Sequence, residues 1–250
     1  MDERRRERPV PSMEGKNVTP DLKILVAVPS SGKWHSATSQ CVAENVANFI
    51  RAKYEGEKDI TVSSIVSSIL PEARQRLVGE AWKWGATHLL FVDSDMAFPF
   101  DAFTRLVQHG MPIVGCNYAR KNLMGLPTAY CEDDELIGSL YGEKDSEGLR
   151  PVKHMGFGLC LIDMRVFEAI DFPFFMFEPT KDGFKFKGED VYFFEKCREA
   201  GLTPMVDMAL SEEVKHLGDF EYTQAFARAA RDADAVEYKN IWEGSRTSAA

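Results

Sequence analysis

A chain of 250 residues, of which 44% are hydrophobic and 28% charged, can bury a substantial core and has the composition of a globular protein, not a disordered one. Its 30 basic and 39 acidic residues leave a formal charge of −9, which argues against nonspecific binding to nucleic acid or to an anionic membrane. No apolar run spans a bilayer, the amino terminus is not signal-like, and five cysteines without a CxxC pair favour reduced thiols, so we expect a cytoplasmic protein.

The first half of the chain alternates between strand-like and helix-like segments. Residues 1–20 contain four arginines without periodicity and predict a flexible tail. Strands are then expected at residues 24–28, 60–66, 88–92 and 112–116, with helices at 36–54, 71–85 and 99–109 between them. This alternation predicts an α/β fold with a mostly parallel sheet and helices on both of its faces.

From residue 117 the pattern changes. Strand-like runs at 128–131 and 136–141, separated by acidic turns, predict a small antiparallel insertion. Further strands are expected at 155–162 and 203–210, and further helices at 164–170, 188–201 and 220–242. We therefore expect one compact domain over 21–219, in halves 21–116 and 117–219, followed by an amphipathic helix and tail over 220–250.

Two carboxylates follow the apolar strand at 88–92 directly, in the sequence Asp93-Ser94-Asp95. A sheet interior cannot hold two ionised carboxylates without partners, because removing their hydration costs several kcal/mol each. Ligands of open α/β sheets bind at the carboxyl ends of strands, and Mg²⁺ or Mn²⁺ prefers carboxylate and phosphate oxygens. The pattern therefore favours a cation site, although aspartates also suit turns and helix caps.

Other candidate residues have an ordinary explanation beside the functional one. His216 could complete a cation site, but a lone histidine is more often a surface or core group. Glu189 and Asp190 begin a helix, where acids favour the macrodipole, yet Asp190 could also deprotonate an attacking hydroxyl. Three cations could hold a diphosphate or could simply be solvated: Arg74, Arg120 and Lys121.

Taken in order, these segments resemble the nucleotide-sugar glycosyltransferases of the GT-A type, particularly the compact family-2-like members of bacteria and phages. The matching residues run from about 22 to 218 and are the strand ending at Pro29, Ala73-Arg74, the stretch 89–95, residues 118–121, Gly156-Phe157-Gly158, Gly188-Glu189-Asp190 and His216. The chain departs from the pattern at one position, with Ala73-Arg74-Gln75 where such proteins often have Ala-Arg-Asn.

The resemblance implies a GT-A fold, an inverting transfer from a UDP-sugar or similar donor, a nucleotide-binding half over 21–116 and an acceptor half over 117–219. It implies that Asp95 and His216 hold Mn²⁺ or Mg²⁺, with Asp93 near the ribose and the metal, and that Asp190, beside Glu189, is the catalytic base. The implied donor-binding and pocket-lining residues are Pro29, Arg74, Asp93, Ser94, Arg120, Lys121, Gly156 and Gly158. The metal hypothesis requires residues 95 and 216 to lie on the same side of the molecule.

The sequence leaves more than one possibility open for the acceptor and for the class of reaction. The acceptor could be a glycan, a small molecule or, as in similar phage enzymes, a hydroxymethylated pyrimidine in DNA, against which the negative charge weighs. A nucleotidyltransferase would also use a strand-end metal, but it usually has a glycine-rich loop after the first strand, and Ser30-Ser31-Gly32 is a poor version of it. A non-catalytic nucleotide-binding module is the third possibility. The oligomeric state is not set by the sequence.

Overall fold

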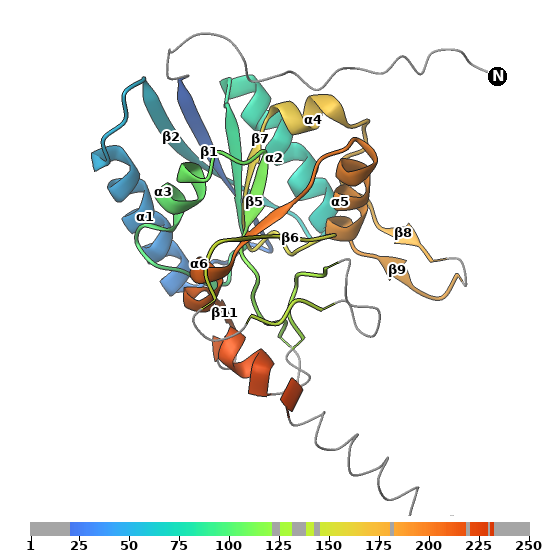
Figure 1. Ribbon diagram of the computed structural model, residues 1–250. Helices are drawn as coiled ribbons and strands as arrows, with labels where there is room; N and C mark the ends of the chain where they lie inside the picture. The colour runs from blue at the N-terminus through green and yellow to red at the C-terminus, as the bar shows by residue number, and fades with distance from the viewer. Residues whose placement is uncertain are drawn as a thin grey trace, which may run out of the picture.

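The computed structural model describes residues 21–121, 126–131, 139–142, 146–180, 183–218, 221–229 and 231–232. The tail expected at 1–20 and residues 233–242 of the expected last helix lie outside these described residues. Figure 1 shows the described elements arranged as a central sheet with helices packed on its two faces. Among the described helices, none is long and apolar enough to cross a membrane.

A seven-stranded, mostly parallel sheet organises the described chain, in the order β2-β1-β3-β7-β5-β10-β6. Its strands are β1 (Leu22–Ser30), β2 (Lys58–Val66), β3 (His88–Val92), β5 (Ile113–Gly115), β6 (Leu149–Pro151), β7 (Leu159–Asp163) and β10 (Met205–Asp207). β1 pairs in parallel with β2 and β3, and β10 with β5, whereas β7 runs antiparallel between β3 and β5, and β6 antiparallel to β10. The predicted α/β, Rossmann-like sheet is confirmed.

Each face of the sheet buries its own core. Ile24 and Val26 in β1 pack with the cluster on one face, while Leu25 and Ala27 pack with the cluster on the other, because successive strand side chains alternate. The first face is covered by α1 (Ser36–Arg51) and α3 (Ala102–Gln108), the second by α2 (Leu70–Trp84), α4 (Arg165–Ala169) and α5 (Glu189–Glu199). The short helix α6 (Met208–Glu213) contributes Leu210 to the first cluster and Met208 to the second. A strand segment buried on both faces must be apolar at every position, as residues 24–29 of β1 and 89–92 of β3 are.

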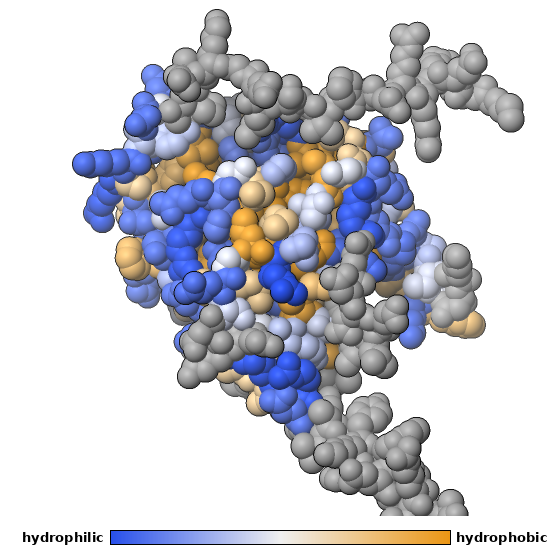
Figure 2. Space-filling view, in the orientation of Figure 1, coloured by the Kyte–Doolittle hydropathy of each residue, from blue (hydrophilic) through white to orange (hydrophobic). Residues whose placement is uncertain are grey.

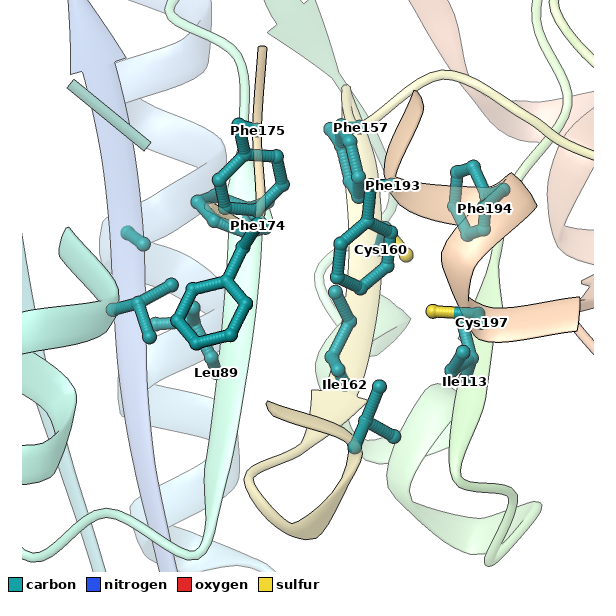
Figure 3. Close-up of a cluster of buried hydrophobic side chains, with 14 of the residues drawn as sticks. Leu89, Ile113, Phe157, Cys160, Ile162, Phe174, Phe175, Phe193, Phe194 and Cys197 are labelled. Carbon is teal, nitrogen blue, oxygen red and sulfur yellow. The ribbon is translucent and has the colours of Figure 1, made fainter. Parts of the chain in front are cut away.

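Phenylalanines dominate the core beneath α2, α4 and α5 (Figure 3). Phe157 stacks on Phe194 with ring centroids 5.1 Å apart, and Phe175 stacks on Phe193 at 5.2 Å. Part of the aromatic segment at 172–177 therefore serves packing, although Phe172 and Phe177 are exposed. Figure 2 shows hydrophobic residues near the middle of the visible face, with hydrophilic residues around them.

Three of the expected elements were wrong in extent or type. The strand expected over 203–210 ends at Asp207, whose side chain accepts a hydrogen bond from the backbone N–H of Leu210 at 2.8 Å and so starts α6. The strand expected over 155–162 is confined to β7. The helix expected from 220 is preceded by β12 (Glu221–Tyr222), and residues 224–229 and 231–232 are helical.

Short antiparallel pairings complete the described structure. β11 (Lys215–Leu217) lies between β12 and β4 (Met96–Ala97), and β8 (Glu178–Pro179) pairs with β9 (Phe186–Lys187). The insertion expected after residue 117 contains isolated bridges, such as the one between Tyr130 and Ser139, and residues 132–138 lie outside the described part.

Candidate functional site

The Asp93-Ser94-Asp95 turn lies where β3 leaves the sheet interior. Leu89 to Val92 are fully buried, whereas the three residues of the turn are half-buried. β4 follows at once and pairs antiparallel with β11, which places His216 opposite Met96 in the register. A histidine more than 120 positions later in the chain is thereby fixed beside Asp95, as the metal hypothesis requires.

The imidazole of His216 faces the carboxylate of Asp95. Its Nε2 lies 3.5 Å from Oδ1 of Asp95, and its Nδ1 lies 3.1 Å from the carbonyl oxygen of Ala119. Because a carbonyl only accepts, Nδ1 is the donor in the second contact, and Nε2 is the ring nitrogen that faces the carboxylate.

Lys121 is the other partner of Asp95. Its ammonium donates to Oδ2 of Asp95, and the two side chains are 30% and 37% exposed. Burial raises the pKa of Asp95, but hydrogen bonds and positive charge from His216 and Lys121 outweigh burial and lower the pKa from 3.8 to about 2. The carboxylate of Asp95 is therefore ionised at neutral pH and lies where water reaches it.

The Asp95–His216 pair fits part of a cation shell. Two ligands about 2.1 Å from one ion can lie up to about 4.2 Å apart, so the 3.5 Å separation is compatible with shared coordination. Among the residues that the structure describes, no three His, Cys, Asp or Glu side chains gather as a metal site. The remaining ligands would have to be water and phosphate oxygens of a substrate, as is usual for Mg²⁺.

Asp93 has a different partner, Arg74 from α2, and its side chain is 24% exposed. Arg74 is 1% exposed; its Nη2 donates to Oδ1 of Asp93 at 2.8 Å and its Nε to Oε1 of Glu189 at 3.3 Å. The guanidinium lies 5.1 Å from the ring of Phe91 and 4.8 Å from that of Phe157. We expected Arg74 to hold a diphosphate; the structure places it instead as a buried link between the end of β3 and the start of α5.

Electrostatics within this buried link favour one charge state for the arginine. Burial alone would lower the pKa of Arg74, but Asp93 and Glu189 raise it above its usual value, so the guanidinium stays charged. Burial raises the pKa of Glu189, and Asp190 and Asp93 raise it further, against the opposing charge of Arg74. Glu189 is thus the member of the link whose protonation the fold favours.

Tyr118 joins the two sides of the site. Its ring packs edge-on against His216 with centroids 5.3 Å apart, and its hydroxyl oxygen accepts from the backbone N–H of Gly158 at 2.8 Å. A Cβ added at Gly156 or Gly158 would lie 2.2 Å or 2.6 Å from the Tyr118 hydroxyl oxygen. We expected these glycines to line a pocket; both are buried against Tyr118, and they are needed to admit its ring.

Asp190 lies at the start of α5, in the same neighbourhood. Its Oδ1 accepts from the backbone N–H of Val191 at 2.8 Å, and the side chain is half-buried. Burial raises the pKa of Tyr118 far above its usual value, and the negative charges of Asp93 and Asp190 raise it further. Of the predicted site residues, His216 is the one whose ring packs directly against Tyr118.

Three further predicted residues are less closely associated with the Asp95–His216 pair: Pro29, Ser94 and Arg120. Pro29 is buried in β1 beside Ile65 of β2, and the carbonyl of Ser94 accepts from the backbone N–H of His35 at 2.8 Å, tying the turn to the start of α1. The guanidinium of Arg120 lies 5.5 Å from the ring of Tyr130, which stacks on His154. Arg120 and Lys121 are neighbours in sequence with different contacts.

The pairing of Arg74 with Glu189 and the position of Tyr118 are features that the sequence pattern did not indicate. The one partial signal was the Gly156-Phe157-Gly158 run, because glycines in a strand-like segment indicate that another group approaches closely. That group is the ring of Tyr118, 38 positions earlier than Gly156.

Comparison with known proteins bears on the fold alone. No family model matches the sequence, and a search of curated proteins finds no match. Among solved structures, A197 from STIV is similar in fold, with a TM-score of 0.51 and 21% identity over 79% of this chain and 87% of that one. UDP-glucose pyrophosphorylase complexed with UDP-glucose has a TM-score of 0.43 and 10% sequence identity, over 88% of this chain and 99% of that one. A nucleoside-diphosphate-sugar pyrophosphorylase from Vibrio cholerae has a TM-score of 0.44 and 12% sequence identity, over 82% of this chain and 99% of that one. The last two likenesses are too distant to support an argument.

Proposed function

We propose that this chain is a divalent-cation-dependent glycosyltransferase that moves a sugar from a nucleoside diphosphate sugar to an acceptor hydroxyl. The observation that carries the proposal is the Asp95–His216 pair at the end of β3, with the imidazole nitrogen turned toward the carboxylate at 3.5 Å. A cation held there, with Lys121 beside it, would neutralise the negative charge that develops on a departing diphosphate.

In the proposed reaction Asp190 is the base. The acceptor oxygen attacks the anomeric carbon, its proton passes to the Asp190 carboxylate, and the bond between that carbon and the diphosphate oxygen breaks with its electron pair left on the diphosphate. A single displacement of this kind inverts the anomeric centre. Arg74 and Asp93 support the site from within, since the guanidinium of Arg74 is buried between Asp93 and Glu189.

The loop after β1 favours this proposal over nucleotidyl transfer. In nucleotidyltransferases a glycine-rich loop offers backbone N–H groups to a triphosphate. Here the N–H of Gly32 donates to the hydroxyl of Ser30 at 3.0 Å, and that hydroxyl donates to the carbonyl of Lys33 at 3.1 Å. The N–H of Gly32 is thus already hydrogen-bonded to a side chain of the same segment, that of Ser30.

The test is product analysis with nucleotide-sugars and Mn²⁺, using glycans, small hydroxylated molecules and hydroxymethylated duplex DNA as acceptors. We expect release of nucleoside diphosphate, with loss of turnover in chelator and in Asp95→Asn, and a fall of about 100-fold or more in Asp190→Asn. Asp171→Asn, an exposed aspartate, is the matched control and should turn over like the wild type. Release of pyrophosphate would assign the site to nucleotidyl transfer, and undiminished turnover of Asp95→Asn would remove the cation role.

A further inference from the structure

We propose that Lys121 is an internal counter-ion. Its ammonium pairs with the carboxylate of Asp95 until a divalent cation displaces it, and the released ammonium then binds the diphosphate of the donor. Metal and donor would consequently bind cooperatively through this one side chain. The inference rests on the proposed function, because it assumes that Asp95 and His216 hold the cation.

The contacts of Asp95 separate a fixed partner from a movable one. His216 is fixed, because its Nδ1 is bonded to the Ala119 carbonyl and its ring packs against Tyr118. Lys121 contacts the other carboxylate oxygen through a flexible four-carbon stem, and its side chain is 30% exposed. Of the two side chains that contact this carboxylate, the ammonium is the one that can leave.

The backbone that carries Lys121 is anchored up to the preceding residue. The side-chain oxygen of Asn117 accepts from the N–H groups of Thr128 and Ala129 at 3.1 and 3.0 Å, and the N–H of Arg120 donates to the carbonyl of Leu126 at 2.8 Å. The same segment therefore presents the Ala119 carbonyl that orients the imidazole and the ammonium that covers the carboxylate. Release of Lys121 needs a rotation of its side chain and no change in the residues before it.

Charge explains why the ammonium must leave. The charges of Asp95 and Lys121 are opposite and offset each other, whereas a doubly charged ion at the same carboxylate would repel an ammonium that stayed in contact with it. Metal binding without a nucleotide therefore has to break an ion pair. When a diphosphate is present, the displaced ammonium gains a new anionic partner, so each ligand increases the affinity for the other by the same factor.

The test measures Mn²⁺ affinity, not turnover. Free Mn²⁺ is titrated by its paramagnetic resonance signal against wild type, Lys121→Met, Lys53→Met and Asp95→Asn, with and without UDP. Lys53 follows α1 at the edge of the sheet opposite the carboxyl ends of β1 and β3, so Lys53→Met controls for the loss of one positive charge. Thermal unfolding of each variant establishes that the exposed substitutions leave the fold intact.

We expect Lys121→Met to bind Mn²⁺ about 10-fold more tightly than wild type without UDP, and to show a smaller increase in affinity when UDP is added. Lys53→Met should match wild type, and Asp95→Asn should lose the site. Equal or weaker Mn²⁺ binding by Lys121→Met would overturn the inference while leaving the cation site of the proposed function intact. Failure of wild type and Lys121→Met alike to bind Mn²⁺ with UDP present would overturn both.

Discussion

Asp93 and Asp95 are separated by one residue, yet their surroundings differ. Asp93 accepts from a guanidinium that is 1% exposed, in a core lined by phenylalanine rings. Asp95 is 37% exposed and is shared between a lysine that reaches it from the surface and a histidine fixed by the backbone. The buried side and the exposed side of the turn thus hold the same kind of charge by different means.

The difference teaches which interactions can exchange. Breaking a buried ion pair leaves a charge without solvation, so its partners are effectively permanent. An exposed pair contributes little to stability because water can replace either partner, and it can therefore be given up to a ligand. A substrate-binding role is consistent with the Asp95 side, and a supporting role with the Asp93 side.

Removing the buried cation should have the largest effect on the fold. Arg74→Met leaves Asp93 and Glu189 without their counter-charge, and we expect a loss of about 3–5 kcal/mol in the free energy of unfolding, measured with urea. Arg76 lies two residues later on α2 and makes an exposed contact with Glu72 at 3.7 Å. Arg76→Met should cost less than about 0.5 kcal/mol. Similar losses in the two variants would contradict the comparison.

The connection between the two sides can be broken at Gly158. A Cβ at this position would lie 2.6 Å from the Tyr118 ring and hydroxyl and 2.9 Å from the sulfur of Met96, so Gly158→Ala should cost about 1–3 kcal/mol and displace the ring that packs on His216. Weakened Mn²⁺ binding should accompany the lost stability. The control is Gly79→Ala inside α2, where a Cβ meets nothing within 4 Å and a gain of about 0.5–1 kcal/mol is expected. Normal Mn²⁺ affinity in Gly158→Ala would show that the two sides are independent.

Local patterns explain how much of this could be predicted from the sequence. The strand at 24–28 is apolar at every position because both of its faces are buried, and α2 ends at Gly85 because that residue adopts a left-handed conformation with φ of 74°. The Asp93-Ser94-Asp95 turn was predictable as the end of a strand, because buried strands cannot continue through two carboxylates.

Long-range pairing could not be predicted in the same way. Nothing in the residues around Arg74 indicates that its partner is Glu189, 115 positions later, since both have ordinary roles on helix surfaces.

The strand expected at 203–210 was wrong for a local reason. The side chain of Asp207 caps a helix there and ends the strand after three residues. The capping bond is a local effect that overrides the hydrophobic pattern.

The smallest expected effect lies on the exposed side and sharpens the comparison through pH and salt. Because the pKa of Asp95 is about 2 in the folded chain against 3.8 normally, its ionised form stabilises the fold above about pH 4, and this contribution is lost as the pH falls from about 4 to about 2. Allowing for solvent screening of a side chain that is 37% exposed, Asp95→Asn should cost about 1 kcal/mol at pH 7.

That cost can be measured by urea unfolding at two pH values and two salt concentrations. The difference between wild type and Asp95→Asn should shrink as the pH approaches 2, and should shrink at pH 7 when the salt concentration rises to about 1 M, where screening acts within a few ångströms. The loss in Arg74→Met should barely respond to salt, since water and ions do not reach the guanidinium. A salt-insensitive loss in Asp95→Asn as large as that of Arg74→Met would mean that the lysine is not exchangeable and that the ammonium cannot give way to a metal ion.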